Sequence, residues 1–356
     1  MTEFDITEVQ IPANLDPSGS DEFCQAMALR NHVDALTFGT TDTALDPAEE
    51  LPLWQPSEFE TYRMFVATVD GRVVGRGDLE TTDGEDGDTA WLAIHVHPNF
   101  QRRGIGSRLL SDLEAIAVAD HKRQIHCYAP AALSDGPILQ SPTGFGSIPR
   151  DSAETHFMLA NGFSLEQVER ISRLPLPLPG LHSLVDRAID HCTRDYAVHE
   201  WVDHCPDRWV EDYAMLFSRM NTDAPSAGLE PPEDVWTVDR MRENESRLIA
   251  GALTPVVAAV EHVATGSLVG FTGLNVPEET TRAIIQGNTI VIREHRGHRL
   301  GMLVKVLNLA HLDRVAPGHP SVITYNAQEN RHMLAVNEAV GFVPIGYEGV
   351  WKRLLE

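Results

Sequence analysis

The sequence AIHVHPNFQRRGIGSRLLSDLEAIA, residues 93–117, passes from a β-branched apolar segment through a turn rich in arginine and glycine into an amphipathic pattern. The apolar positions after the turn follow helical spacing. They are Leu109, Leu110, Leu113 and Ile116. The turn therefore lies at a helix N-terminus, where backbone N–H groups have no intrahelical acceptor and the helix dipole is positive. Glycines let this backbone approach a ligand closely, and Arg102, Arg103 and Arg108 add positive charge, so a diphosphate is the natural partner.

The turn from Gln101 to Gly106 resembles the acyl-CoA-binding signature of the GCN5-related N-acetyltransferases (GNATs). That signature is Gln or Arg, two residues, Gly, one residue, then Gly or Ala, set between a strand and a helix. The resemblance implies acetyl-CoA as cofactor and a backbone N–H on the preceding strand that binds the oxyanion of the reaction. In this part of the chain it assigns cofactor binding to Val96, His97, Arg102, Arg103, Gly104, Ile105, Gly106 and Ser107.

The composition limits the function classes. Asp and Glu total 52 against 28 Lys and Arg, a formal charge of −24, which argues against nucleic-acid binding and favours a neutral or cationic acceptor. No apolar run is long enough for a membrane span, and the N-terminus lacks the features of a signal peptide. We therefore expect a cytoplasmic protein with reduced cysteines. The oligomeric state is not legible from the sequence.

Two landmarks recur at the same separation, which indicates a duplication. The β-hairpin turn at Asp70 and the glycine-rich turn at Gln101 both have counterparts 195 residues later, at Thr265 and Arg296. The fold class predicted for the chain is α/β (α+β), with two tandem GNAT-type domains that each form a mixed, mainly antiparallel sheet flanked by helices. The predicted domains are residues 1–173 and 195–356. Between them, residues 174–194 read as a proline-rich linker with a possible helix.

The second turn departs from the family signature, because arginine replaces glycine at its fourth position and a glycine stands at its second. The helix N-terminus and the final glycine remain, so we still expect phosphate binding there. With the oxyanion donor of the preceding strand, the predicted cofactor-binding residues of this copy are Val291, Ile292, Arg296, Gly297, His298, Arg299, Leu300, Gly301 and, further along, Asn330.

The tyrosine that many GNATs use as the acid toward the departing thiolate is missing from both copies. Counted back from the Gly-Phe pair that ends each copy, its position holds Met158 in the first and Asn337 in the second. Tyr325 is a further candidate close to Asn337 in sequence. We therefore take Asn337 and Tyr325 as the candidates for catalytic positions in the second copy.

Two residues of the first copy are candidates for the base that deprotonates the acceptor amine. His95 lies on the strand before the turn, and an imidazole titrates near neutral pH. Glu80, at the end of the hairpin, is the carboxylate alternative. A hydrogen-bonded structural histidine remains the competing interpretation of His95. In the second copy Gln286 and Asn288 occupy the strand and are unable to act as bases.

Two other polar clusters have weaker functional interpretations. The acidic residues between Met220 and Asp239 could attract a cationic amine, or they form a solvated loop. They are Asp223, Glu230, Glu233 and Asp234. The residues His191, Cys192, His199, His204 and Cys205 lack the paired spacing of a zinc site, so no metal site is predicted.

In its tandem layout the chain resembles mycothiol synthase and related two-domain bacterial acetyltransferases. The resemblance implies an acetyl-CoA-dependent N-acetyltransferase that acetylates a primary amine of a small molecule directly, with the second domain as the catalytic one. Because neither copy has the usual acid, a non-enzymatic acyl-CoA-binding or sensor protein is one alternative. Acetylation of protein lysines or N-termini is another.

Overall fold

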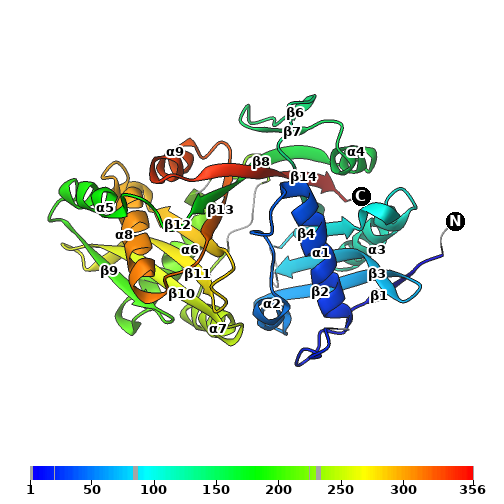
Figure 1. Cartoon of the computed structure of the whole chain (residues 1–356), viewed down its shortest axis with the longest axis horizontal. Coiled ribbons are helices and arrows are strands. Elements are labelled where there is room, and N and C mark those ends of the chain that lie inside the picture. Colours follow the sequence, from blue (N-terminus) through cyan, green and yellow to red (C-terminus); the bar gives the residue numbers. More distant parts are fainter. Residues whose placement is uncertain (1–2, 20, 83–86, 224, 230–233, 356) are drawn as a thin grey trace.

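The computed structural model describes residues 3–19, 21–82, 87–223, 225–229 and 234–355 (Figure 1). The N-terminal half contains β1 (Asp5–Glu8), α1 (Glu22–Phe38), α2 (Pro47–Trp54), β2 (Glu60–Val69), β3 (Arg72–Thr82), β4 (Thr89–Val96), α3 (Ile105–Ala119), β5 (Gln124–Ala131), β6 (Ile138–Gln140), β7 (Ser147–Pro149), α4 (Ala153–Ala160) and β8 (Ser164–Pro175). The C-terminal half contains α5 (Leu181–Asp190), β9 (Tyr196–Val202), α6 (Val210–Asp223), α7 (Val238–Ala250), β10 (Leu253–His262), β11 (Ser267–Pro277), β12 (Ile284–Val291), α8 (Leu300–Val315), β13 (Ser321–Ala327), α9 (Arg331–Val340) and β14 (Val343–Leu354). Single-turn 3₁₀ helices precede α3, α6 and α8.

Local sequence explains where most helices begin. The side chain of Asp21 accepts a hydrogen bond from the N–H of Cys24 at the start of α1, and Ser152 and Thr237 cap α4 and α7 in the same way. The predicted hairpin at Asp70 is present, with Asp70 and Gly71 both at positive φ. The duplication is also evident, since the helices and strands of the two halves follow the same order apart from α5 and the hairpin of β6 and β7. The short hairpin of β6 and β7 was not predicted, and it is present only in the N-terminal half of the described chain.

The predicted fold class is confirmed, but the two halves share one sheet. In the described residues its twelve strands follow the order β1-β2-β3-β4-β5-β14-β8-β13-β12-β11-β10-β9. Every described pairing in it is antiparallel except β4 with β5 and β12 with β13. These two parallel pairs are short, and in each the two strands separate before they end. The register stops at Ala93 opposite Tyr128 in one pair and at Ile285 opposite Ile323 in the other.

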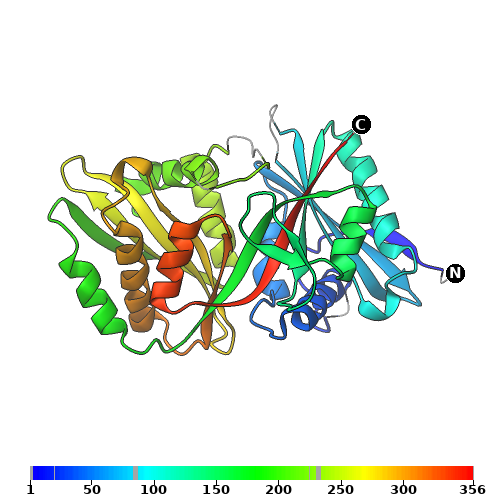
Figure 2. The same cartoon turned by 90° about the horizontal axis from the view of Figure 1, so that it is seen from above.

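The last strand of each half lies across the boundary between the halves (Figures 1 and 2). Strand β14 pairs with β5 of the N-terminal half, and β8 pairs with β13 of the C-terminal half. The two exchanged strands also pair with each other. As a result Trp351 of β14 is fully buried within the hydrophobic core of the N-terminal half. The halves are therefore joined by backbone hydrogen bonds and by core packing.

Helices α2 and α7 make a second contact between the halves, below the shared strands in Figure 1. There Arg247 of α7 donates to the backbone oxygens of Leu53 and Pro56.

In the described part of the chain, no helix is both long and apolar enough to cross a membrane.

Candidate functional site

A cleft lies at the N-terminus of α3 and a second one at the N-terminus of α8. The N-half cleft, about 790 Å³, lies among the ends of β4 and β5, the turn before α3, and α4. The C-half cleft, about 650 Å³, has the equivalent walls of β12, β13, the turn before α8, and α9. In both halves the cleft occupies the place where the parallel strands part. The duplicated fold thus provides two related clefts as candidate ligand sites.

The two turns have the same backbone shape although their glycines differ. In the first turn Arg102 and Gly104 have positive φ angles of 61° and 90°. In the second, Gly297 and Arg299 have positive φ angles of 89° and 58°, each 195 residues after its counterpart. Glycine adopts this conformation without strain, whereas arginine adopts it at a cost in free energy. Each copy has a glycine at one of the two positive-φ positions and an arginine at the other, and the two copies differ in which position holds the glycine. Arg299 is therefore compatible with the same turn.

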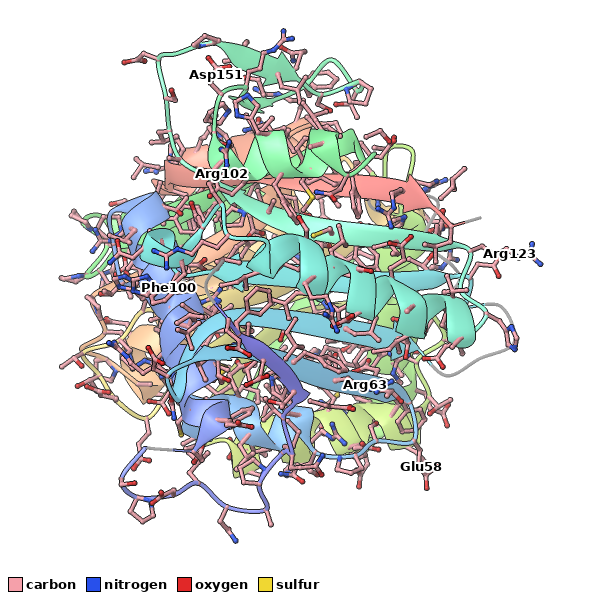
Figure 3. All side chains as sticks on the ribbon, turned by 90° about the vertical axis from the view of Figure 1, so that its right-hand side faces the viewer. Glu58, Arg63, Phe100, Arg102, Arg123 and Asp151 are labelled. Atoms are coloured by element: carbon pink, nitrogen blue, oxygen red, sulfur yellow. The ribbon has the colours of Figure 1, made fainter. Side chains whose placement is uncertain are left out.

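No described side chain caps the N-terminus of α3 or α8, in contrast to α1, α4, α7 and α9. The first intrahelical bonds run from Arg108 to Gly104 and from Leu303 to Arg299. The N–H groups before these residues have no intrahelical acceptor and lie at the positive end of the helix dipole. Figure 3 shows Phe100 and Arg102 at the turn that precedes α3. Both helix starts are thus suited to an anionic group.

The strands before the two turns end with equivalent hydrogen bonds in both halves. The N–H groups of His97 and Ile292 donate to Val74 and Val269 across the sheet. The N–H groups of the preceding residues, Val96 and Val291, consequently point to the opposite side, toward the parted strand.

Strand β12 also contains a bulge that β4 lacks. In the register of β11 with β12, Thr272 faces Thr289 and Leu274 faces Gln286, so Gly287 and Asn288 together oppose a single residue. The described register of β3 with β4 is uninterrupted. A bulge leaves its extra residue outside the ladder and re-aims the backbone. This difference distinguishes the C-half cleft from the N-half cleft.

The two candidate bases of the N-terminal half lie apart. His95 lines the N-half cleft, where its Nε2 is 3.7 Å from Oδ1 of Asp34 on α1. Glu80 of β3 lies opposite Trp91 of β4 in the sheet, and Trp91 is four residues before His95 on that strand. It faces Tyr62 and Glu60 of β2, and burial together with Glu60 raises its pKa to about 7. The structure therefore does not bring His95 and Glu80 into one site.

Tyr325 and Asn330 of the C-terminal half line its cleft, whereas Asn337 lies behind the lining. Tyr325 lines the cleft, and burial together with the charge of Glu348 raises its pKa. Asn337, a residue of α9, is fully buried, accepts a hydrogen bond from Lys305 and donates one to Asn326. Asn330 lines the cleft and caps α9 through a bond from the N–H of Met333.

A pair of carboxylates that sequence reasoning missed lies on the exchanged strands. Glu169 of β8 and Glu348 of β14 are directly opposite each other in the sheet. Burial raises the pKa of Glu169 to about 7, with a smaller effect of Glu329. Burial also raises the pKa of Glu348 to about 8, reinforced by Glu169 and Asp34 and opposed by Arg30 of α1. Glu169 lines the C-half cleft although it belongs to the N-terminal half, so no local motif could have revealed it.

Of the acidic loop, Glu230 and Glu233 lie outside the described residues, while Asp223 and Asp234 are ion-paired. Asp223 contacts Arg293 and Arg296, and Asp234 contacts Arg240. The carboxylates of these two residues are therefore not free to attract a cationic amine.

In the histidine and cysteine cluster, His199 and His204 bond to Glu261 and Glu245. Within the described ranges no group of three or more His, Cys, Asp or Glu residues has a geometry suited to a metal ion.

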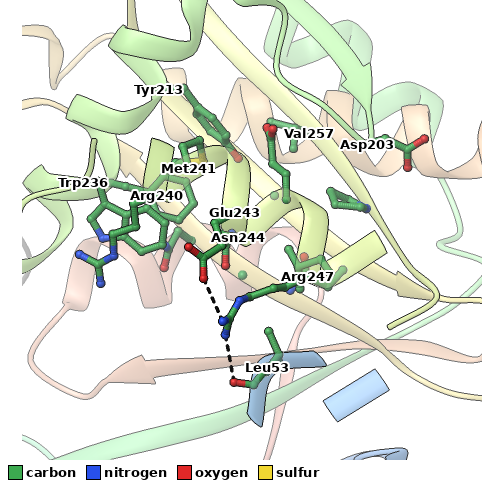
Figure 4. Close-up of a pocket in the computed structure, with 18 of the residues that line it drawn as sticks. Leu53, Asp203, Tyr213, Trp236, Arg240, Met241, Glu243, Asn244, Arg247 and Val257 are labelled. Atoms are coloured by element: carbon green, nitrogen blue, oxygen red, sulfur yellow. Dashed lines mark hydrogen bonds and ion pairs between the residues drawn. The ribbon is translucent and has the colours of Figure 1, made fainter. Parts of the chain in front are cut away.

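A third cavity, of about 390 Å³, lies between the halves and is called here the interdomain pocket (Figure 4). Aromatic rings dominate its lining. They are Phe59, Tyr62, Trp201, Tyr213, Phe217, Trp236 and Phe271. Its charged lining residues are Glu60, Asp203, Glu243, Glu245, Arg240 and Arg247. Four carboxylates thus oppose two guanidinium groups. Gly287 and Asn288, the bulged residues of β12, line both this pocket and the C-half cleft, so the two cavities meet at the bulge.

Comparison with known proteins agrees with this architecture. Residues 33–132 match the model of the acetyltransferase (GNAT) family. A segment of 88 residues, 25% of this chain, is 35% identical to a mycothiol acetyltransferase of Amycolatopsis mediterranei (strain U-32) and covers 28% of that protein.

Among the solved structures that match nearly the whole chain are the following two. A tandem GNAT protein from the clavulanic acid biosynthesis pathway has a TM-score of 0.73 at 23% identity, covering 99% of this chain and 98% of its own. A GCN5-related N-acetyltransferase from Sphaerobacter thermophilus has a TM-score of 0.60 at 13% identity, covering 99% and 95%. These structural likenesses extend the fold over both halves.

Proposed function

Because this chain is a protein of the tandem GNAT type, we propose that it transfers an acetyl group from acetyl-CoA to a primary amine of a small molecule. The C-terminal half is the catalytic one in this proposal. The observation that carries it is the meeting of the C-half cleft and the interdomain pocket at the bulge of Gly287 and Asn288. An acyl donor in the cleft and an amine in the pocket would come together there.

The donor would bind along the cleft in three parts. Its diphosphate would contact the free N–H groups at the start of α8, at Leu300 to Met302. Its pantetheine arm would lie between β12 and β13, where the N–H of Val291 faces the gap. Its thioester carbonyl would reach the bulge, whose backbone N–H groups would stabilise the oxyanion of the tetrahedral intermediate. Acetyl-CoA would supply the activated acetyl group.

The acceptor would occupy the interdomain pocket. A cavity of about 390 Å³ matches a small molecule in size. Its aromatic rings favour an apolar or aromatic body, and they also attract an ammonium group through their π faces. Asp203 of the lining adds a carboxylate to that attraction, whereas Glu60, Glu243 and Glu245 are ion-paired with arginines. We therefore assign the acceptor to primary amines with an apolar or aromatic body.

Glu169 is the base in this proposal, because it lines the C-half cleft and has a pKa of about 7. A base must be ionised to act, so kcat/KM should rise with pH through about 7. Glu169→Gln should lower kcat/KM about 100-fold and remove this rise. Glu329→Gln removes the negative charge that raises the pKa of Glu169, so the rise should persist but shift to lower pH. Steady-state rates measured across pH test this, and an unchanged profile in Glu169→Gln would exclude Glu169 as the base.

The function itself is tested by thiol release from acetyl-CoA over a panel of arylalkylamines, polyamines, amino sugars, amino acids and lysine peptides. We expect turnover on arylalkylamines.

Trp236→Ala should then raise KM for the amine about tenfold and leave kcat nearly unchanged, because it removes a ring of the acceptor pocket. Phe145→Ala, at an exposed position outside the three cavities, is the matched control. CoA binding without turnover on any amine would instead identify an acyl-CoA-binding protein, and turnover on peptides alone would identify a protein acetyltransferase.

A further inference from the structure

A buried lysine lies at the inner wall of the C-half cleft. Lys305 of α8 is 1% exposed, and its Nζ donates a hydrogen bond of 2.6 Å to Oδ1 of Asn337 on α9. Nδ2 of Asn337 donates in turn to Oδ1 of Asn326 on β13, also at 2.6 Å. Lys305 and Asn326 both line the cleft. The three side chains thus form a polar chain that connects α8, α9 and β13 behind the parted strands.

The N-terminal half shows that the fold does not require this chain. The helices α3 and α8 begin 195 residues apart, so Lys305 corresponds to Leu110. The Gly-Phe pairs place Asn337 opposite Met158. Leu110 and Met158 are both buried members of the N-terminal hydrophobic core. The same architecture is therefore built with an apolar pair in one half and with an ammonium–amide pair in the other.

The environment of Lys305 makes it a proton carrier near neutral pH. Burial lowers the pKa of its amino group to about 7, and no charged described residue contributes to this shift. Its neighbours from the packed elements are the amide of Asn337 and the ring of Phe342, whose centroid is 5.3 Å from Nζ. Burying an unpaired ammonium opposes folding, so packing alone gives no reason for a lysine here.

We propose that Lys305 is the acid that protonates the departing thiolate of CoA, held in place by Asn337 and Asn326. This inference rests on the proposed acetyl transfer and adds the proton source that the missing tyrosine leaves open. Asn337 stands at the position of that tyrosine and presents Lys305 to the cleft. The N-terminal half, with Leu110 and Met158, has no such donor at these positions.

The step balances as follows. Glu169 first takes a proton from the ammonium ion and releases it to solvent. The resulting neutral amine attacks the thioester carbonyl, and the C–S bond of the tetrahedral intermediate breaks with its electron pair on sulfur. Lys305 transfers a proton from Nζ to that sulfur, which leaves neutral lysine and CoA thiol. The nitrogen of the new amide loses its extra proton to the base, and lysine regains a proton from solvent. In sum, acetyl-CoA and an ammonium ion give an amide, CoA and one proton.

The test uses the full-length protein and two readouts. The first is single-turnover acetyl transfer, which in Lys305→Met should be about 100-fold slower, with the dissociation constant of CoA nearly unchanged. The second needs no acceptor: the ionisation of the thiol of bound CoA, followed by the ultraviolet absorbance of the thiolate. Lys305 and the thiol titrate as a coupled pair, in which the ammonium favours the thiolate and the thiolate keeps the ammonium protonated. The thiol pKa should therefore be about one unit lower in the wild type than in Lys305→Met.

A second variant guards against misfolding. Lys305→Leu with Asn337→Met copies the pair of the N-terminal half, frees only Oδ1 of Asn326, which lines the cleft, and should show the same two effects. Leu110→Met, at the equivalent place on α3, is the control and should change neither readout. An equal thiol pKa in wild type and both variants would overturn the assignment of Lys305. A thiol shift without turnover on any amine would support Lys305 and contradict the proposed function.

Discussion

Gly301→Asp is expected to remove CoA binding at the C-terminal half while the protein remains folded. Gly301 is the second residue of α8, and a Cβ there meets no atom within 4 Å. The carboxylate would therefore enter the cleft without a clash and would repel a diphosphate at the helix N-terminus. The loss of charge-assisted hydrogen bonds should weaken binding about 100-fold, or about 2.7 kcal/mol. Isothermal titration calorimetry with CoA measures both affinity and stoichiometry.

Two matched variants complete this experiment. Gly301→Ala adds only a methyl group in open space and should keep the affinity within about threefold. Gly106→Asp makes the equivalent change in the N-half cleft, where a Cβ lies 3.3 Å from the ring of Phe157. If both clefts bind CoA, each aspartate should remove one site and leave the other. Unchanged stoichiometry and affinity in both aspartate variants would contradict CoA binding at these turns.

Trp351→Ala is expected to destabilise the N-terminal half although residue 351 lies near the C-terminus of the chain. Trp351 is fully buried among residues of the N-terminal core, because β14 is inserted between β5 and β8. Truncation of a buried tryptophan to alanine costs about 3–5 kcal/mol. Hydrogen exchange should therefore show lost protection first in α3 and β5, with α8 less affected.

Leu354 supplies the control on the same strand. It is 70% exposed, so Leu354→Ala should change the free energy of unfolding by less than about 0.5 kcal/mol. A loss of protection confined to α8, β10 and β11 in Trp351→Ala would mean that β14 supports its own half instead. Thermal unfolding of both variants gives the overall cost.

The sequence alone determined the local structures and their duplication. Hairpin turns, helix caps and apolar periodicity depend on residues a few positions apart, so they are legible in one dimension. The turn from Gln101 to Gly106 belongs to this class, and so does its copy from Arg296 to Gly301. The common offset of 195 residues indicated two copies of one unit. The positive φ at Arg299 shows why a glycine moved by two positions still forms the same turn.

Only the tertiary structure decided which residues share a site. The exchange of β8 and β14 places Glu169 of one half in the cleft of the other, and sheet pairing over such separations leaves no local pattern. The interdomain pocket likewise exists only because the halves pack together. In the sequence Lys305 resembles any charged residue of a helix. Only the fold shows that it is buried and bonded to Asn337 of α9. Burial and pairing, which give these groups their chemistry, arise from contacts between segments that are distant in the chain, and the sequence does not show those contacts.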